Sequence, residues 1–242
     1  MMAQQNSISI AATLDDAKNL LEIQQKIVYY NTSEQELQSI FLHNWPNSFK
    51  NRKTALSKRF IEAYQKDLYF AKKEELGATE IKNISVNFET ATYRVLEKQI
   101  DLLEIPLKET LKQNDSIIIN ATYRIKIPSA KFTSYGKTAT GYQLRYWYLN
   151  PAVYHKQWQL MSNLNNDDLY EIPSNYTLDL KLSKGYKVNS NLKKQKTIGK
   201  DFNHFHFTGK QKIDLTLVID KADTFQIYKT KNLAVHTDIL NG

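Results

Sequence analysis

The chain contains no cysteine, so disulfide bonds and cysteine metal sites are excluded. This absence does not choose between export and the cytoplasm, because cysteine-free chains occur in both compartments. No run approaches about 18 consecutive apolar residues, so we predict no membrane span. The first residues, Met1–Asn6, also lack the apolar segment of a signal peptide.

The N-terminal residues nevertheless resemble the start of a mature exported protein, with a small residue and then polar ones after the methionines. We therefore predict export to the periplasm or cell envelope with the signal peptide removed, and a cytoplasmic location also agrees with the composition. Residues 1–6 are expected to be disordered or to have been added for expression. The length of 242 residues allows one large β-domain or two small domains.

The chain has few arginines for so basic a protein. Its net charge is +8, which makes a nucleic acid or an anionic surface worth considering as a partner. The lysines are scattered, and the densest clusters, Lys50–Lys53 and Lys193–Lys196, lie in no motif that reads a nucleic-acid groove. We therefore interpret the charge as a solvated, lysine-rich surface and predict no nucleic-acid partner. The five arginines are Arg52, Arg59, Arg94, Arg124 and Arg145.

Alternation of apolar and polar residues recurs along most of the chain and predicts an all-β protein. Short strands at regular spacing favour a sandwich or a stack of sheets. The predicted strands are 7–13, 20–30, 39–43, 81–89, 93–96, 99–103, 116–127, 143–148, 157–160, 176–182, 186–188, 196–198, 204–208, 213–219, 225–228 and 233–236. Long loops are expected at 128–141 and 163–168, where contacts to ligands or partners usually lie in such scaffolds.

One segment has helical rather than strand periodicity. Thr54–Lys73 spaces its apolar residues at three and four positions, which predicts an inserted amphipathic helix. Thr54 or Ser57 is expected to cap its start, and Gly77 to close its end. Such a helix must lie against a sheet face or edge.

A run of aromatic residues surrounds two polar ones between Tyr142 and Tyr154. Gln143 and an apparently buried Arg145 lie within it, and a buried polar group without a partner costs about 1–3 kcal/mol. These two side chains are therefore structural anchors or face a ligand. The rings of the run are expected in the core, with a stacking platform for sugars or bases as the alternative. The rings concerned are Tyr142, Tyr146, Trp147, Tyr148, Tyr154 and Trp158.

Several spans in register resemble the N-terminal β-domain of the aminopeptidase N family of zinc metallopeptidases (gluzincins), in particular its Bacteroidetes-like bacterial branch. The resemblance covers about residues 7–235, nearly the whole chain. It is carried by Thr13–Glu22 with Tyr29–Ser33, Ile40–Thr54, Asp115–Ile119 with Ile125–Pro128, Gln143–Tyr154, and Tyr170 with Tyr176–Leu182. The sequence departs from the family's usual residues at Asn150, His155 and Gln157–Met161.

The resemblance implies a saddle-like, multi-sheet β-sandwich over 1–242 with one inserted helix, and a place beside a peptide cleft. Gln143 matches a family glutamine that contributes to that cleft, and its amide can both donate and accept hydrogen bonds. Gln143 and Arg145 are therefore the predicted substrate-binding residues. The alternatives are that Gln143 bonds a strand edge and that Arg145 anchors a buried carboxylate or carbonyl.

The zinc-binding chemistry of that family is missing from this sequence. None of the five histidines precedes a glutamate and no two lie four apart, so there is no His-Glu-x-x-His helix, and the Gly-x-Met-Glu-Asn strand is absent too. We predict no catalytic residue, metal or cofactor in this chain, with zinc in the catalytic domain of a parent protein. The chain is then a fragment that packs on its own downstream peptidase domain, or a natural protein that kept only this domain. A rival interpretation is a stand-alone β-sandwich module that binds a partner protein or a glycan.

Two further segments contain residue types that could bind a metal. His204 and His206 are predicted on one side of a strand, where Asp201 is the only nearby third ligand, so we interpret them as surface histidines. Asn165–Asp168 has the composition of a calcium loop but lacks its glycine and distal glutamate, so we interpret it as an ordinary polar loop.

Overall fold

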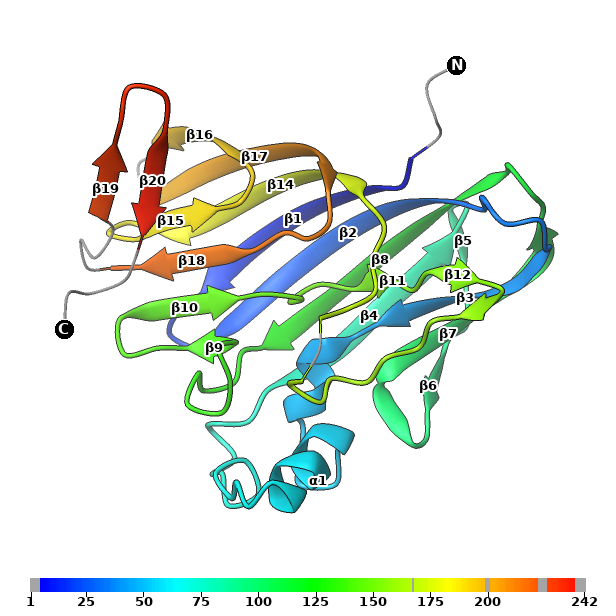
Figure 1. Ribbon diagram of the computed structural model, residues 1–242, viewed down its shortest axis with the longest axis horizontal. Helices are drawn as coiled ribbons and strands as arrows, with labels where there is room; N and C mark the ends of the chain where they lie inside the picture. Colours follow the sequence, from blue (N-terminus) through cyan, green and yellow to red (C-terminus); the bar gives the residue numbers. More distant parts are fainter. Residues whose placement is uncertain (1–4, 167, 199–200, 222–225, 238–242) are drawn as a thin grey trace.

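A computed structural model describes residues 5–166, 168–198, 201–221 and 226–237 (Figure 1). Most of these residues form strands, which confirms the all-β sandwich. Asn6, at the end of the segment expected to be disordered or added for expression, is buried, and its Oδ1 accepts a hydrogen bond from the Tyr30 backbone N–H. Among the described residues, no helix is long and apolar enough to cross a membrane.

The largest element is an eight-stranded sheet in the order β16-β17-β14-β1-β2-β8-β4-β5. All neighbours are antiparallel except β1 and β14, which run parallel with Ile10 beside Leu178. Alternation works as the sequence predicts, since every second residue of β1 and β2 faces the core. The bounds are β1 Ser7–Asp15, β2 Leu20–Tyr30, β4 Ala78–Val86, β5 Glu89–Thr90, β8 Ser116–Lys126, β14 Ser174–Ser183, β16 Lys193–Ile198 and β17 Phe202–Lys212.

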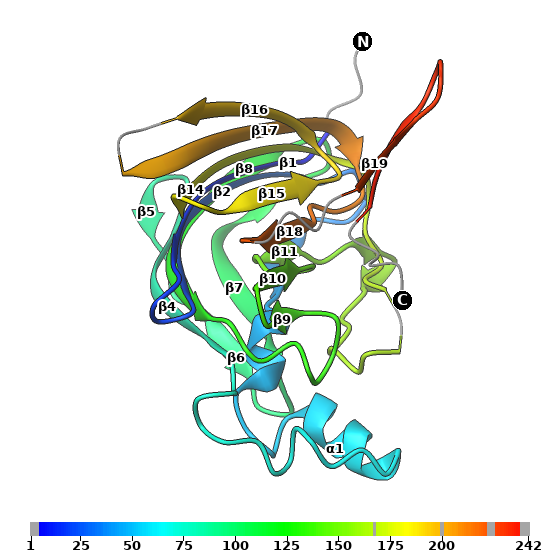
Figure 2. The same cartoon turned by 90° about the vertical axis from the view of Figure 1, so that its left-hand side faces the viewer.

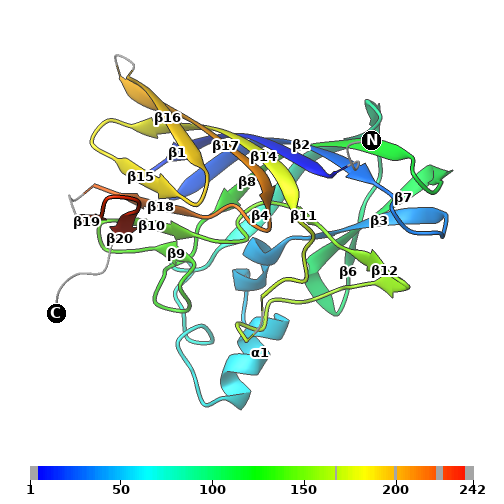
Figure 3. The ribbon, with the colours of Figure 1, turned by 45° about the horizontal axis from the view of Figure 1, so that its top comes forward.

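Two four-stranded sheets lie under the curved large sheet, which gives the saddle shape in Figures 2 and 3. Their orders are β15-β18-β10-β9 and β11-β3-β7-β6. The first comprises β9 Gly136–Lys137, β10 Gly141–Leu144, β15 Lys187–Ser190 and β18 Leu217–Asp220; the second comprises β3 Leu37–His43, β6 Arg94–Leu96, β7 Gln99–Leu111 and β11 Asn150–Pro151. Separate hairpins are β12 Tyr154–His155 with β13 Gln157–Trp158, and β19 Gln226–Lys229 with β20 Ala234–Thr237.

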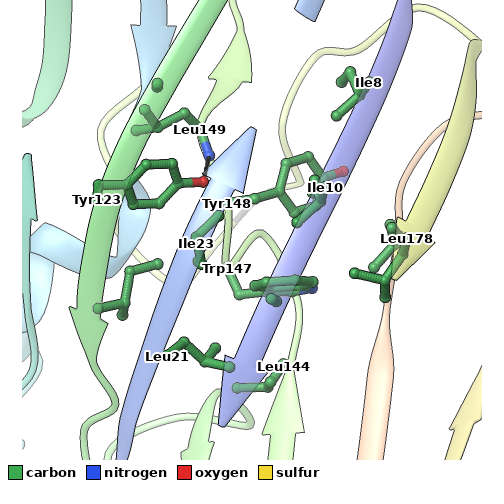
Figure 4. Packing of buried hydrophobic residues seen from close by; sticks show 14 of the residues in the cluster. Ile8, Ile10, Leu21, Ile23, Tyr123, Leu144, Trp147, Tyr148, Leu149 and Leu178 are labelled. Carbon is green, nitrogen blue, oxygen red and sulfur yellow. Dashed lines mark hydrogen bonds between the residues drawn. The ribbon is translucent and has the colours of Figure 1, made fainter. Parts of the chain in front are cut away.

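The core fills the space between the large sheet and the two smaller ones (Figure 4). A buried polar residue of β2, Gln25, fixes one of the loops to the sheet from inside. Its Nε2 donates to the Leu149 carbonyl oxygen at 2.7 Å, and its Oε1 accepts from the Leu149 N–H at 3.2 Å and from the Tyr123 hydroxyl. Both ends of the amide are thus satisfied, so the loop after β10 is held against the sheet.

The predicted helix is much shorter than its periodicity indicated. Helix α1 spans Ala55–Glu62, and Thr54 caps it as expected by accepting a hydrogen bond from the Ser57 N–H at 3.2 Å. The helix ends because Tyr64 adopts a left-handed conformation, with φ of 59°. Gly77 does not close helix α1. Its N–H instead donates to the carbonyl oxygen of Phe49, the last residue of the short 3-10 helix Trp45–Phe49.

The aromatic run is not one strand. Strand β10 stops at Leu144, where a strand through Tyr148 was predicted, because Tyr146 turns the chain with φ of 50°. Tyr142, Tyr146, Trp147 and Tyr148 are buried, so these four rings belong to the core and cannot form a stacking platform. Tyr154 and Trp158 are half-buried and pack against the core. Phe225, at the start of a predicted strand, lies outside the described residues.

Candidate functional site

The two predicted substrate-binding residues lie where β10 leaves its sheet. Tyr142 and Leu144 point into the core, so the alternation of the strand turns the half-buried Gln143 to the opposite side. Gln143 pairs with Val218 of β18 on one side and with Gly136 of β9 on the other. Within the described part of the chain, its side-chain amide makes no hydrogen bond, so the prediction that it bonds a strand edge finds no support.

The aromatic neighbours of Arg145 predict a buried side chain, but 48% of its side chain is exposed. Its Nη1 lies 2.8 Å from Asp168 Oδ1, and its Nε lies 3.2 Å from Asp214 Oδ2. The guanidinium also lies over the Tyr146 ring, 4.7 Å from the centroid. Arg145 thus pairs with one mostly buried carboxylate, Asp214, and one exposed carboxylate, Asp168, and connects three separate loops.

Asp214 is the better fixed of the two carboxylates, since only 17% of its side chain is exposed. Asn191 donates from Nδ2 to Asp214 Oδ1 at 2.8 Å and to the Asp214 carbonyl oxygen at 2.9 Å. The Thr216 N–H in turn donates to Asn191 Oδ1 at 3.1 Å. The loop between β17 and β18 is therefore pre-shaped to receive the guanidinium.

A pocket of 170 Å³ opens beside this ion-pair cluster. Its floor is aromatic: Trp45 meets Tyr146 edge to face at 4.9 Å, and Trp45 Nε1 donates to the Met161 carbonyl oxygen at 2.8 Å. Its rim is polar and includes Arg145. The lining residues are Trp45, Pro46, Phe49, Thr133, Ser134, Tyr135, Arg145, Tyr146, Asn163, Asn165, Asn166 and Asp168. An apolar floor under a polar rim suits a small polar ligand or a peptide side chain.

The loop that carries Asp168 also carries Glu171, a residue that the sequence analysis missed. Burial and then the nearby charge of Asp214 raise the pKa of Glu171 to about 8, against the opposing effect of Arg145. Its buried Oε2 has no hydrogen-bond partner among the described residues. A carboxyl with this pKa is largely protonated at neutral pH. Nothing in its sequence context, Tyr170-Glu171-Ile172-Pro173, signals such burial.

The histidines do not assemble a metal centre in the part of the chain that the structure describes. His204 and His206 share a face of β17 as predicted, and His206 Nδ1 lies 2.7 Å from Asp179 Oδ1. No group of three His, Cys, Asp or Glu side chains comes together among the described residues, so they do not fit a zinc ion.

The other three histidines are His43, His155 and His236. His43 is buried, which lowers its pKa to about 4, and its Nε2 accepts a hydrogen bond from the Met161 N–H. His155 is exposed on β12. The side chain of His236 and all of Asp167, from the loop with calcium-like composition, lie outside the described residues.

Comparisons with known proteins find no matching family model and no matching curated protein. Solved structures do match. An M1 zinc metallopeptidase from Deinococcus radiodurans, in a mutant form bound to a Tyr-Ser-Ala substrate, aligns with a TM-score of 0.54 and 10% identity, covering 96% of this chain and 46% of that one. A two-domain M1 zinc metallopeptidase mutant bound to L-arginine aligns with a TM-score of 0.52, the same identity and the same coverage.

These alignments concern architecture, because an identity of 10% shows the fold alone. The chain spans less than half the length of the matched metallopeptidases. The relation to a Bacteroidetes-like branch stays a prediction from the sequence. The chain therefore has the fold of the N-terminal domain of M1 zinc metallopeptidases, which is the architecture that its resemblance to the aminopeptidase N family implies.

Proposed function

We propose that the chain is a non-catalytic domain of a zinc aminopeptidase-like protein, which frames a peptide cleft and packs on a peptidase domain. The observation that carries the proposal is the fold match over 96% of this chain to structures that are about twice as long, one of them bound to a tripeptide. The zinc and the hydrolytic residues belong to the other domain, because this sequence has no His-Glu-x-x-His.

Gln143 is the residue proposed to contact the peptide. Its amide is half-buried, lacks a hydrogen-bond partner among the described residues and faces away from the core. A primary amide can accept from a terminal amine or a peptide N–H and donate to a peptide carbonyl. Held by β9 and β18 on both sides, its backbone is fixed before the peptide arrives, so little ordering entropy is lost on binding.

Arg145 is proposed to act beside it, at the rim of the aromatic-floored pocket. Because Asp168 and Asp214 already neutralise its charge, it is better suited to hold three loops in place than to attract an anionic group. Its part in peptide binding is then to fix the rim, with donors left over for a carbonyl.

A titration of the 242-residue chain with the tripeptide Tyr-Ser-Ala, followed by amide NMR shifts, tests this role. We expect weak binding, because the other half of the cleft is absent, with the largest shifts at Gln143 and its neighbours. Gln143→Ala should weaken binding by about tenfold, the loss of roughly one hydrogen bond. Gln24→Ala is the matched control, since Gln24 lies exposed on the outer face of the large sheet.

Two results would count against the proposal. Shifts that spread over the outer face of the large sheet and do not respond to Gln143→Ala would remove the assigned role of Gln143. A natural reading frame that stops near Gly242, with no His-Glu-x-x-His downstream, would favour the rival interpretation of a stand-alone binding module. That rival has no six-ring aromatic platform to use, because four of the rings are buried in the core.

A further inference from the structure

Residues 50–76, here called the helical excursion, leave the sheet assembly after the 3-10 helix and return at β4. They project below the sheets in Figures 1 and 3. The excursion is anchored from inside by Leu56, Phe60 and Leu68, all buried in the main core. The excursion is therefore an ordered projection that is fixed to the core from inside.

Three large apolar side chains point outward from the excursion. Ile61 is 39% exposed, Phe70 72% and Tyr64 90%. The Phe70 ring lies 5.1 Å from the neighbouring Tyr69 ring. Scattered apolar residues are ordinary on a surface, but these three lie within ten positions of one projecting segment.

Tyr64 is the most informative of the three. Its left-handed φ of 59° follows directly on α1, at the position where helices favour glycine. The backbone of this turn is formed by the Gln65 N–H, which donates to the Phe60 carbonyl oxygen at 2.7 Å. A left-handed backbone disfavours tyrosine at this position, and the exposed ring gains little from packing within the chain. We therefore interpret the Tyr64 side chain as a contact for a binding partner.

The charge of the excursion indicates the kind of partner. It carries eight basic and four acidic residues, a net charge of +4, which is half of the +8 of the whole chain. Lys53, Lys58 and Lys66 are all exposed. The excursion is thus basic around its exposed apolar side chains, the combination that binds at the boundary between lipid headgroups and acyl chains.

We propose that the helical excursion docks the protein on the surface of a bilayer that contains anionic phospholipid. The lysines and arginines meet the headgroups, while Tyr64, Phe70 and Ile61 enter the boundary region. A projecting segment with side chains directed outward can reach a flat surface without any rearrangement of the sheets. This role is separate from the peptide cleft, since it uses none of the residues assigned there.

Sedimentation with lipid vesicles tests the proposal, using phosphatidylcholine alone and phosphatidylcholine mixed with phosphatidylglycerol. We expect the full chain to bind the mixed vesicles at low salt and to be released at high salt. The double variant Tyr64→Ser with Phe70→Ser should weaken this binding by about tenfold. Lys53→Glu with Lys66→Glu should weaken it at least as much, because each charge near the surface matters.

Matched controls use residues outside the excursion. Phe88→Ser removes an aromatic side chain that is 76% exposed at the turn between β4 and β5, and Lys184→Glu with Lys210→Glu reverses two exposed lysines. Both control variants should bind as the wild type does. A Tyr64→Gly variant should melt at a higher temperature than the wild type and yet bind vesicles less well, which separates a docking role from a structural one.

The proposal is overturned if the wild-type chain does not bind anionic vesicles at low salt. It is equally overturned if neutral vesicles are bound as well as anionic ones, or if the controls lose as much binding as the excursion variants. If the partner of the excursion is an acidic protein and not lipid, the wild-type chain will not bind anionic vesicles, which is the first of these outcomes.

Discussion

At the scale of single residues, Glu171 is the clearest case of a side chain whose state depends on its surroundings. It lies near Asp214 and Asp168, and Arg145 supplies the only nearby positive charge among the causes of its pKa shift. A carboxyl in this position holds its proton more tightly in the folded than in the unfolded state. The free energy of unfolding must therefore depend on pH through this residue.

We predict that Glu171→Gln changes this pH dependence. The folded pKa of about 8 lies above the ordinary value of 4.5, so the stabilisation from Glu171 is complete below about pH 4.5 and is lost as the pH rises toward 8. Relative to the wild type, the variant should gain up to about 1.4 kcal/mol of stability per pH unit across that window. Urea unfolding at several pH values measures the difference.

A wild type and variant whose stabilities run parallel from acid to alkaline pH would show that the Glu171 carboxyl is ionised in the folded protein. Glu62→Gln, an exposed change on α1, is the control and should leave the pH profile unaltered.

At the scale of elements, β10 is short but well fixed, and a single glycine explains why. A Cβ at Gly141 would lie 1.9 Å from the Ile219 carbonyl oxygen of β18, closer than any contact allows. The obstacle is backbone, which cannot move without breaking the pairing of β10 with β18. The positions of Gln143 and Arg145 thus depend on Gly141, which has no side chain to clash with β18.

We predict that Gly141→Ala destabilises the protein by about 3 kcal/mol or more, because the clash separates two paired strands. Gly185→Ala is the comparison: its φ of 90° is unfavourable for alanine, but nothing lies within 4 Å of the added Cβ. That change should cost only about 1 kcal/mol. Chemical denaturation of the two variants gives the difference directly, and equal losses would contradict the strand-clash account.

At the scale of the whole molecule, the sequence predicted the strands better than the connections between them. The bounds of β2 match their prediction, because buried and less buried residues alternate from Leu20 to Tyr30, with Gln25 as the one polar residue at a buried position. The helix and the aromatic run were misjudged for a shared reason: Tyr64 and Tyr146 both take left-handed conformations, which tyrosine rarely does and which no pattern of apolar residues reveals.

The candidate site was predictable only in part. Gln143 came from a resemblance in sequence and Arg145 from its place in the aromatic run; Gln143 is half-buried and Arg145 is exposed. The partners Asp168 and Asp214 and the burial of Glu171 arise where three loops meet. Such meetings depend on the pairing of strands far apart in the chain, which local patterns do not determine.

We predict that the purified chain shows no zinc-dependent hydrolysis of aminoacyl amides and binds no stoichiometric zinc. The described residues bring no three ligands together, and the sequence has no His-Glu-x-x-His. Metal analysis after dialysis against zinc, with a chromogenic aminoacyl-amide assay alongside, measures both. Hydrolysis that a chelator abolishes would overturn the assignment as a non-catalytic domain.

The parallel pairing of β1 with β14 has a consequence for the order in which the protein folds. During synthesis, β1, β2 and β8 can form an antiparallel sheet as soon as they emerge, because each pairs with a strand already present or soon to follow. The other edge of β1 must wait until Ser174–Ser183 has been made. In that interval Ile8, Ile10 and Ala12 of β1 lie beside an unpaired strand edge. The partly synthesised chain is therefore most prone to aggregation before β14 has been made.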